Sequence, residues 1–583
     1  MVLWKRKTLW MVFCPLLLAV GVLGIVPRSV FPAYSFLWLP LLLLCGWLTL
    51  RFTQLENHQK SAYVLGFAFS FFFALGYRMR FQDGIGGLAG WGLLLAAAAG
   101  AAPAVAYGVA LLHRCCLRLK QRPALADGSP KKAFWFYAAV LLGCWLPVFL
   151  AYYPGLFAYD VMFQIPQVVE GTYRTDSPIL HTLWLGAFYL FGGAIGSHTL
   201  GMALYTIVQM GFHALILAYA MTSLYRQGCP RAVRTGCLLF FALCPIHSMM
   251  SISMTKDVLY SSLLLLALLL LREAWVNSGW LNDTKHKLGL ILTVALTCLM
   301  RTNGVFVFVL FGAAVCVTGL IRRSAVRRIS VLVLAGMLLF GGSSMLLSKS
   351  LQAKPSPVKE LLSVPLQQAS RVYSLHQAEL PESDAAQIRE FIPGVYAYVE
   401  TYVDHVKAFA NVGMGNIGDF AAFWAKLLVQ YPSEYIDAFL FNCQGYWFMD
   451  DTSQASHYGV GLEGRQGYLL SDTKQGFGVE HTSYFPALEQ LYENLFSANA
   501  YQQIPIFSQI FSLALYSWLL GFVIYWALCD RRRDVLLCAG MLLGSLLMLW
   551  LGPCAIVRYQ YPLMLGVPIL LGLLCSPASK EAL

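Results

Sequence analysis

The sequence predicts an all-α polytopic membrane protein with about 14 spans and one large, mainly helical extracytoplasmic domain. The first observation is composition: 58% of the 583 residues are hydrophobic and 12% are charged, whereas soluble proteins carry about 25% charged residues. The second is a series of apolar stretches, each close to the roughly 20 residues that a helix needs to cross a bilayer. The third is one long polar segment, residues 349–504, between two groups of apolar stretches.

The charges of the chain are distributed unevenly, although the net charge is +12. Between Lys354 and Glu493, Asp and Glu outnumber Lys and Arg by 17 to 8. Most other basic residues stand in short loops between apolar stretches, which is the pattern of cytoplasmic loops. The positive charge therefore indicates orientation in a cell membrane, and no nucleic-acid partner is predicted.

Residues 1–133 are predicted to form four membrane helices and a cytoplasmic loop. The loop 113–132 contains six Lys or Arg residues, so it is expected inside the cell together with the N-terminus. The first apolar stretch follows Lys5-Arg6-Lys7 but lacks a convincing cleavage site of small residues, which favours a retained helix over a signal peptide. The four spans are expected near residues 9–26, 33–51, 61–77 and 88–112.

Residues 134–348 are predicted to form a catalytic transmembrane module with an outer loop at residues 153–181. The stretch 182–196 is short and contains Gly192-Gly193. If it crossed the membrane, the basic loop 226–234 would lie outside, against the usual charge bias. We therefore expect it to lie at the outer surface or to re-enter. The remaining spans are expected at residues 134–152, 199–224, 235–252, 258–271, 288–300, 304–321 and 330–347.

Asp160 is the most informative residue of the outer loop. A carboxylate just past a membrane span is costly near lipid and indicates a function. If a helix begins at Tyr159, then Asp160, Gln164 and Gln167 lie on one face of it. The alternative is that Asp160 only caps that helix, because Asp is a favoured N-cap residue.

The C-terminal region, residues 505–583, is predicted to contain three further spans, at 505–528, 535–551 and 561–574. Both termini are then cytoplasmic. This topology brings polar residues from four connections to the outer membrane face. They are Asp160, Asp176, His181, Lys256, Asp257, Arg301 and Arg558.

These residue types suit the transfer of a group from a lipid phosphate. A carboxylate can act as a base or a metal ligand, and Lys and Arg stabilise phosphate. The simpler alternatives are helix capping by Asp257 and interfacial snorkelling by the arginines. We predict catalytic roles for Asp160 and Asp257, and donor-phosphate binding by Arg301, Arg558 and Lys256. We predict substrate binding by Gln164, Asp176, His181 and Tyr559.

Over about residues 134–574, the chain resembles the GT-C superfamily of membrane glycosyltransferases, most closely a poorly characterised bacterial group. The resemblance rests on Asp160 in the first outer loop, the surface stretch 182–196 and Asp257 in the next outer loop. Further matching stretches are Asp176–Thr182, Arg301–Gly304, Arg558–Tyr559 and Pro365–Arg371.

The resemblance implies an inverting transfer of a sugar, with Asp160 as catalytic base. The donor is a polyprenyl-phosphate-linked sugar in the membrane lipid, and the acceptor is an extracytoplasmic glycan, lipid or protein. No paired acidic metal signature is evident, so no cofactor is predicted and a divalent metal is left as an option without a clear motif.

Two other functions fit a membrane protein of this kind. A transporter or flippase of a lipid-linked saccharide predicts internal repeats and broken helices with charge at mid-membrane. A glycan polymerase or ligase shares the same site chemistry but uses a diphosphate donor. The charges at span ends and the large outer domain favour the glycosyltransferase.

Overall fold

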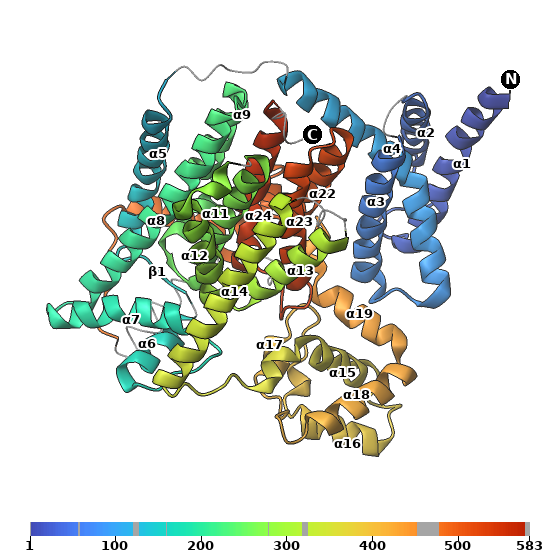
Figure 1. Cartoon of the computed structure of the whole chain (residues 1–583). Coiled ribbons are helices and arrows are strands. Elements are labelled where there is room, and N and C mark those ends of the chain that lie inside the picture. The colour runs from blue at the N-terminus through green and yellow to red at the C-terminus, as the bar shows by residue number, and fades with distance from the viewer. Residues whose placement is uncertain are drawn as a thin grey trace.

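The computed structural model of the chain is a bundle of helices with a smaller helical domain at one end, which we call the polar domain (residues 351–442; Figure 1). The structure describes residues 2–55, 59–120, 128–158, 160–277, 279–317, 324–451 and 477–577. In these residues, seven helices are long and apolar enough to cross a membrane, or eight if one bent pair counts as a span. The chain is therefore a helical membrane protein, but the predicted total of about 14 spans is not confirmed. Parts of the predicted cytoplasmic side, residues 121–127 and 318–323, lie outside the described residues.

The four N-terminal helices pack on one another at one side of the molecule (blue in Figure 1). The turn between α3 and α4 reaches the polar domain, where Arg371 Nη2 donates to Asp83 O at 2.7 Å and Ile85 N donates to Asp437 Oδ1 at 3.2 Å. Gly84 in this turn has φ +141°, and a Cβ there would lie 2.3 Å from Asp437 Oδ2, so the close approach requires glycine. The N-terminal helices thus brace the polar domain. Their bounds are Val2–Ile25 (α1), Trp38–Thr53 (α2), Gln59–Gln82 (α3) and Gly87–Lys120 (α4).

The main bundle is built around α11 and α24. Of the seven candidate spans these two are the most buried, with 83% and 78% of the apolar window inside the protein, so neighbouring helices cover them from lipid. The N-terminal ends of both helices reach the same end of the bundle, where the polar domain lies (Figure 1). The bundle consists of α5 (Pro130–Ala151), α8 (His198–Arg226), α9 (Arg231–Leu243), α10 (Pro245–Ile252), α11 (Lys256–Val276), α12 (Thr284–Met300), α13 (Asn303–Val317), α14 (Ser324–Ser350), α22 (Leu513–Cys529), α23 (Arg533–Leu549) and α24 (Val557–Cys575), with a 3₁₀ turn η1 (Trp280–Asn282) before α12.

Two helices between α5 and α8 do not follow the direction of the bundle. Helix α6 (Val161–Glu170) is short, and α7 (Ile179–Ala194) has 16 residues, fewer than a helix needs to cross a bilayer. Figure 1 shows α7 lying transverse to α5, at the same end of the molecule as α6. This placement agrees with the expectation that stretch 182–196 lies along a surface rather than across the bundle.

The predicted span 235–252 is broken into two helices. Helices α9 and α10 meet at an angle of 51° at Cys244-Pro245, because proline has no N–H to continue the helical hydrogen bonds. Helix α10 leads into strand β2 (Ser253–Met254), which pairs in parallel with β1 (Leu156–Phe157). This two-stranded sheet ties the loop before Asp160 to the segment before Lys256.

A hydrogen-bonded chain of buried side chains joins four bundle helices. Ser262 Oγ donates to Val258 O and accepts from His213 Nδ1 at 2.7 Å. The neutral His213 ring then accepts from Tyr561 Oη at 2.9 Å, and Tyr561 Oη in turn accepts from His247 Nδ1 at 3.0 Å. With these assignments every donor has an acceptor. The hydrogen-bonded side chains therefore fix the positions of α10 and α24 relative to α8 and α11.

Removing the Tyr561 hydroxyl should therefore destabilise the bundle. In Tyr561→Phe the buried His247 Nδ1–H loses its acceptor, and the expected loss is about 1–3 kcal/mol. Thermal unfolding of the purified protein in detergent measures it. Tyr34→Phe is the matched control, because Tyr34 is 91% exposed and should leave the unfolding temperature unchanged. An equal effect of both variants would contradict a stabilising role for this hydrogen-bonded chain of side chains.

The end of the bundle away from the polar domain carries its own buried ion pairs. Asp534 accepts from Arg272 Nη2 at 2.8 Å and from Arg532 Nε at 2.9 Å through its two oxygens. Lys120 at the end of α4 donates to Asp530 at 2.8 Å. Loops that are predicted from their charge to share the basic side thus contact one another.

The polar domain has its own hydrophobic core, formed by side chains from Leu366 to Tyr435. From Phe441 onward the buried side chains join the core of the main bundle instead. The predicted domain 349–504 therefore divides into a separate globular part and a part that packs on the helices. Its elements are η3 (Val358–Leu361), α15 (Ser363–His376), α16 (Glu382–Phe391), η4 (Val395–Ala397), α17 (Asp404–Lys407), α18 (Ile417–Gln430), α19 (Pro432–Asn442) and η5 (Gln444–Tyr446), followed by α21 (Pro486–Phe496), η8 (Ser497–Gln503) and η9 (Phe507–Phe511).

Candidate active site

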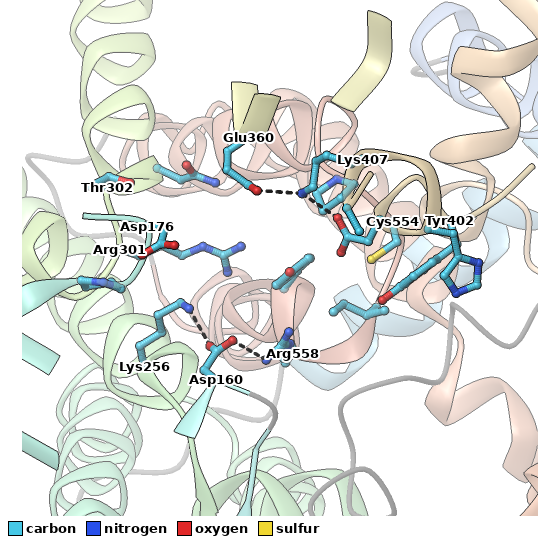
Figure 2. Close-up of a pocket in the computed structure, with 18 of the residues that line it drawn as sticks. Asp160, Asp176, Lys256, Arg301, Thr302, Glu360, Tyr402, Lys407, Cys554 and Arg558 are labelled. Atoms are coloured by element: carbon cyan, nitrogen blue, oxygen red, sulfur yellow. Dashed lines mark hydrogen bonds and ion pairs between the residues drawn. The ribbon is translucent and has the colours of Figure 1, made fainter. Parts of the chain in front are cut away.

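A cavity of about 860 Å³ lies where the polar domain meets the ends of the bundle helices. Its walls come from segments far apart in the sequence, and Figure 2 shows the principal side chains facing one another. Six of the nine predicted site residues line it, and they are Asp160, Asp176, Lys256, Arg301, Arg558 and Tyr559.

One wall of the cavity contains Lys256, Arg301 and Arg558, and we call it the cationic side. Asp160 lies among these three cations. It occupies the N-cap position of α6, which begins at Val161, but its side chain makes no capping hydrogen bond. Its carboxylate instead accepts from Lys256 Nζ at 2.5 Å and lies 3.5 Å from Arg558 Nη1. The capping alternative is therefore wrong for this side chain, and Tyr159, the predicted first helical residue, lies outside the described residues.

The adjacent residues Lys256 and Asp257 lie in different environments. Both begin α11, where Thr255 caps the helix by accepting from Asp257 N at 3.3 Å. Lys256 lines the cavity, whereas Asp257 is fully buried and does not. Its carboxylate accepts from Arg301 Nη1 at 2.5 Å and lies 4.0 Å from Arg558 Nε. Asp257 therefore contacts both arginines on the side away from the cavity and does not face a ligand.

Two arginines and an aromatic ring form a stack at the cavity wall. The guanidinium of Arg301 lies 4.4 Å from the centre of the Tyr559 ring, and that of Arg558 lies 5.2 Å from it. Burial would lower the pKa of Arg301, but Asp257 and Tyr559 raise it, so this group stays charged. The contacts fix both guanidinium planes in advance of ligand binding, as cation–π and charge-assisted contacts do.

The electrostatic balance of the cationic side explains the state of Asp160. Burial would raise the pKa of its carboxyl, but Lys256 and Arg558 outweigh burial and hold the pKa well below the ordinary value of 3.8. Asp160 is thus ionised at neutral pH. Together with Asp257 it offsets two of three positive charges, and one positive charge is left for an anionic ligand.

Gln164 and His181 do not line the cavity, although both were predicted to bind substrate. They are fully buried, and His181 ring nitrogens lie 3.1 Å from Gln164 Oε1 and 2.9 Å from Tyr205 Oη. Burial, with the nearby Lys256, lowers the pKa of the His181 imidazole to about 3, so the ring is neutral. These residues form a buried polar network near Asp160, and His181 acts on that carboxyl only through electrostatics.

Asp176 lines the cavity but belongs to a separate ion pair. Its Oδ2 lies 3.0 Å from Arg174 Nη2, and both side chains are partly exposed. The neighbouring Thr175 is held by the polar segment after α14, where Thr175 N donates to Lys354 O at 3.0 Å. Asp176 therefore lines the cavity while it forms a partly exposed ion pair of its own.

The residues that the structure describes contain no group of three His, Cys, Asp or Glu that could hold a metal ion. The stretch Pro365–Arg371 lies in α15, away from the cavity lining. Its Arg371 donates to Glu434 at 3.0 Å as well as to the α3–α4 turn, so its contacts are structural.

One whole wall of the cavity was not predicted from the sequence. This wall belongs to the polar domain, and no periodicity or motif singled it out, because its residues sit in a 3₁₀ turn, a four-residue helix and the loops beside them. The residues are Glu360, Tyr402, Asp404, His405 and Lys407, together with Ala397, Ala408 and Phe409.

A family model matches residues 169–582, which include Lys256, Asp257, Arg301 and Arg558 but begin after Asp160. Neither a curated protein nor a solved structure matches the chain. Since the match covers more than half of the chain, the protein belongs to this family, which is described as a family of unknown function (DUF6020).

Proposed function

We propose that the chain is an inverting membrane glycosyltransferase of the GT-C type, with about 14 spans, cytoplasmic termini and an extracytoplasmic site. It moves a sugar from a polyprenyl-phosphate-linked donor to an acceptor hydroxyl. The observation that carries the proposal is the cluster at the cavity: one ionised carboxylate, Asp160, contacts Lys256 and Arg558, with Arg301 beside them. A base next to phosphate-binding cations is what this transfer requires.

In the proposed reaction, the donor phosphate binds Lys256, Arg558 and Arg301, and the polyprenyl tail stays in the lipid. Asp160 accepts the proton of the acceptor hydroxyl as its oxygen attacks C1 of the sugar. The new C1–O bond forms while the bond from C1 to the phosphate oxygen breaks, and polyprenyl phosphate leaves with one more negative charge. The three cations stabilise that charge.

The low pKa of Asp160 gives the donor a second role. A carboxylate held by Lys256 and Arg558 is a weak base. When the donor phosphate attracts the same two cations, their pull on Asp160 weakens and its pKa rises. The base would thus become effective only when the donor is bound.

The charge balance favours a monophosphate donor over the diphosphate of a polymerase or ligase. Three cations and two carboxylates meet at the cationic side, and a phosphodiester carries one negative charge. A diphosphate would bring at least two and leave the site overcharged.

The transporter alternative has one observation in its favour, the break between α9 and α10. Broken helices line the substrate sites of many transporters. However, residues 235–252 contain no Asp, Glu, Lys or Arg, and the charged cluster lies at the end of the bundle. The break is better explained by the turn that delivers β2 and Lys256 to the cavity.

The direct test uses the full chain in lipid nanodiscs with a panel of radiolabelled polyprenyl-phosphate sugars and cell-envelope extract as acceptor. We expect label in the acceptor fraction and an equal amount of free polyprenyl phosphate. Transbilayer movement of a labelled lipid-linked saccharide in proteoliposomes, without transfer, would replace the proposal with the flippase.

Lys256→Ala should weaken donor binding. The variant removes a charge-assisted contact worth about 1.5–3 kcal/mol, so the donor KM should rise about 10- to 100-fold. Lys285→Ala is the matched control, since Lys285 is exposed at the start of α12, at the other end of that helix from Arg301. An unchanged donor KM in Lys256→Ala would contradict the phosphate role.

A further inference from the structure

The wall that the polar domain contributes to the cavity differs in charge from the cationic side. Lys407 is 8% exposed and lies between two carboxylates, 2.9 Å from Glu360 Oε2 and 2.6 Å from Asp404 Oδ1. Burial would lower the pKa of Lys407, but Asp404 and Glu360 raise it, so the lysine stays charged. The three groups together carry one negative charge, which repels a phosphate.

The same wall presents aromatic and hydrogen-bonding groups. The rings of Tyr402 and His405 meet edge to face, with centres 4.8 Å apart. Figure 2 shows Tyr402, Glu360 and Lys407 across the view from Lys256 and Asp160. Aromatic rings pack against the C–H face of a sugar, and carboxylate oxygens accept hydrogen bonds from its hydroxyl groups.

The wall is fixed to the segment that carries Arg558. Tyr402 forms an isolated antiparallel bridge with Cys554, and Val403 N donates to Pro553 O at 3.0 Å. Asn442 Nδ2 also donates to Gly552 O at 2.7 Å. These bonds hold the aromatic wall at a constant distance from the cationic side, which two substrates need in order to react.

We propose that this wall is the acceptor subsite and that the acceptor is a saccharide, bound against Tyr402 and His405 with its hydroxyl groups on Asp404 and Glu360. The inference rests on the proposed function, and it selects a glycan from the acceptors considered, which also include lipids and proteins. The phosphate of the donor is confined to the cationic side, so a neutral, hydroxyl-rich group takes the rest of the cavity. Its reacting hydroxyl then points across to Asp160.

The test separates glycan binding from catalysis. The full chain in nanodiscs is titrated, without any donor, with fluorescently labelled mannotriose, maltotriose and chitotriose, and binding is followed by fluorescence anisotropy. At least one glycan should bind to the wild-type chain, Tyr402→Ala should weaken that binding at least tenfold, and Asp404→Asn should weaken it as well.

Tyr396→Ala is the matched control, because Tyr396 belongs to the same domain, is 69% exposed and does not line the cavity. Failure of all three glycans to bind, or binding that Tyr402→Ala leaves unchanged, overturns the acceptor subsite. Binding that depends on Tyr402 in a chain that transfers no sugar retains the subsite and rejects the proposed function. If sugar is transferred to a lipid or peptide at a rate that Tyr402→Ala does not change, the proposed function stands and the acceptor subsite is rejected.

Discussion

Asp160→Asn should lower the rate of sugar transfer by about 10²- to 10⁴-fold, the usual contribution of a general base. Asparagine has the same shape as aspartate but cannot accept a proton at neutral pH. The substitution also removes one of the two carboxylates that offset Lys256, Arg301 and Arg558. The donor KM should therefore stay the same or fall, while kcat collapses. Initial rates at varied concentrations of the donor identified by the panel separate the two parameters.

The matched control for this variant is Asp419→Asn. Asp419 is an exposed residue in the first turn of α18 and does not line the cavity, so its variant should keep full activity. Thermal unfolding of both variants checks that the loss is not a loss of structure. If Asp160→Asn keeps more than a tenth of the wild-type kcat, another group removes the proton and the proposed mechanism fails.

The sequence was sufficient to predict which charged residues would meet, since that depends on topology. The run of basic loops indicated which span ends share a side, and Asp160, Lys256, Arg301 and Arg558 do line one cavity. The stretch around Gly192-Gly193 forms a helix of 16 residues, α7, which is too short to cross a bilayer; its place at the outer membrane surface stays a prediction.

Other features depend on packing that no local pattern records. Lys256 and Asp257 are neighbours at the start of α11, yet one faces the cavity and the other is buried behind it. Gln164 and His181 were expected at the substrate and lie in a buried polar network near Asp160. The polar domain's wall was missed because hydrophobic periodicity indicates cores and says nothing about which polar loop covers a site.

Arg301→Ala should cost about 3–5 kcal/mol of stability, the penalty for leaving a buried charge unpaired. Asp257 is fully buried, and Arg301 at 2.5 Å is its nearest cation, with Arg558 Nε at 4.0 Å. A simple loss of activity in this variant would therefore not establish phosphate binding. Unfolding of the purified protein, followed by heat or denaturing detergent, measures the change.

A second substitution separates the two roles of Arg301. In Arg301→Ala/Asp257→Asn the buried carboxylate that lost its arginine is also removed, so most of the lost stability should return and the coupling energy should reach about 1–3 kcal/mol. The matched control is Arg174 and Asp176, the same residue types 3.0 Å apart but partly exposed, whose coupling should stay below about 1 kcal/mol. Equal coupling in the two pairs would mean that water reaches Asp257. If the stabilised double variant still shows a raised donor KM, the missing guanidinium acts on the donor itself, whereas a normal KM would leave Arg301 only the task of neutralising Asp257.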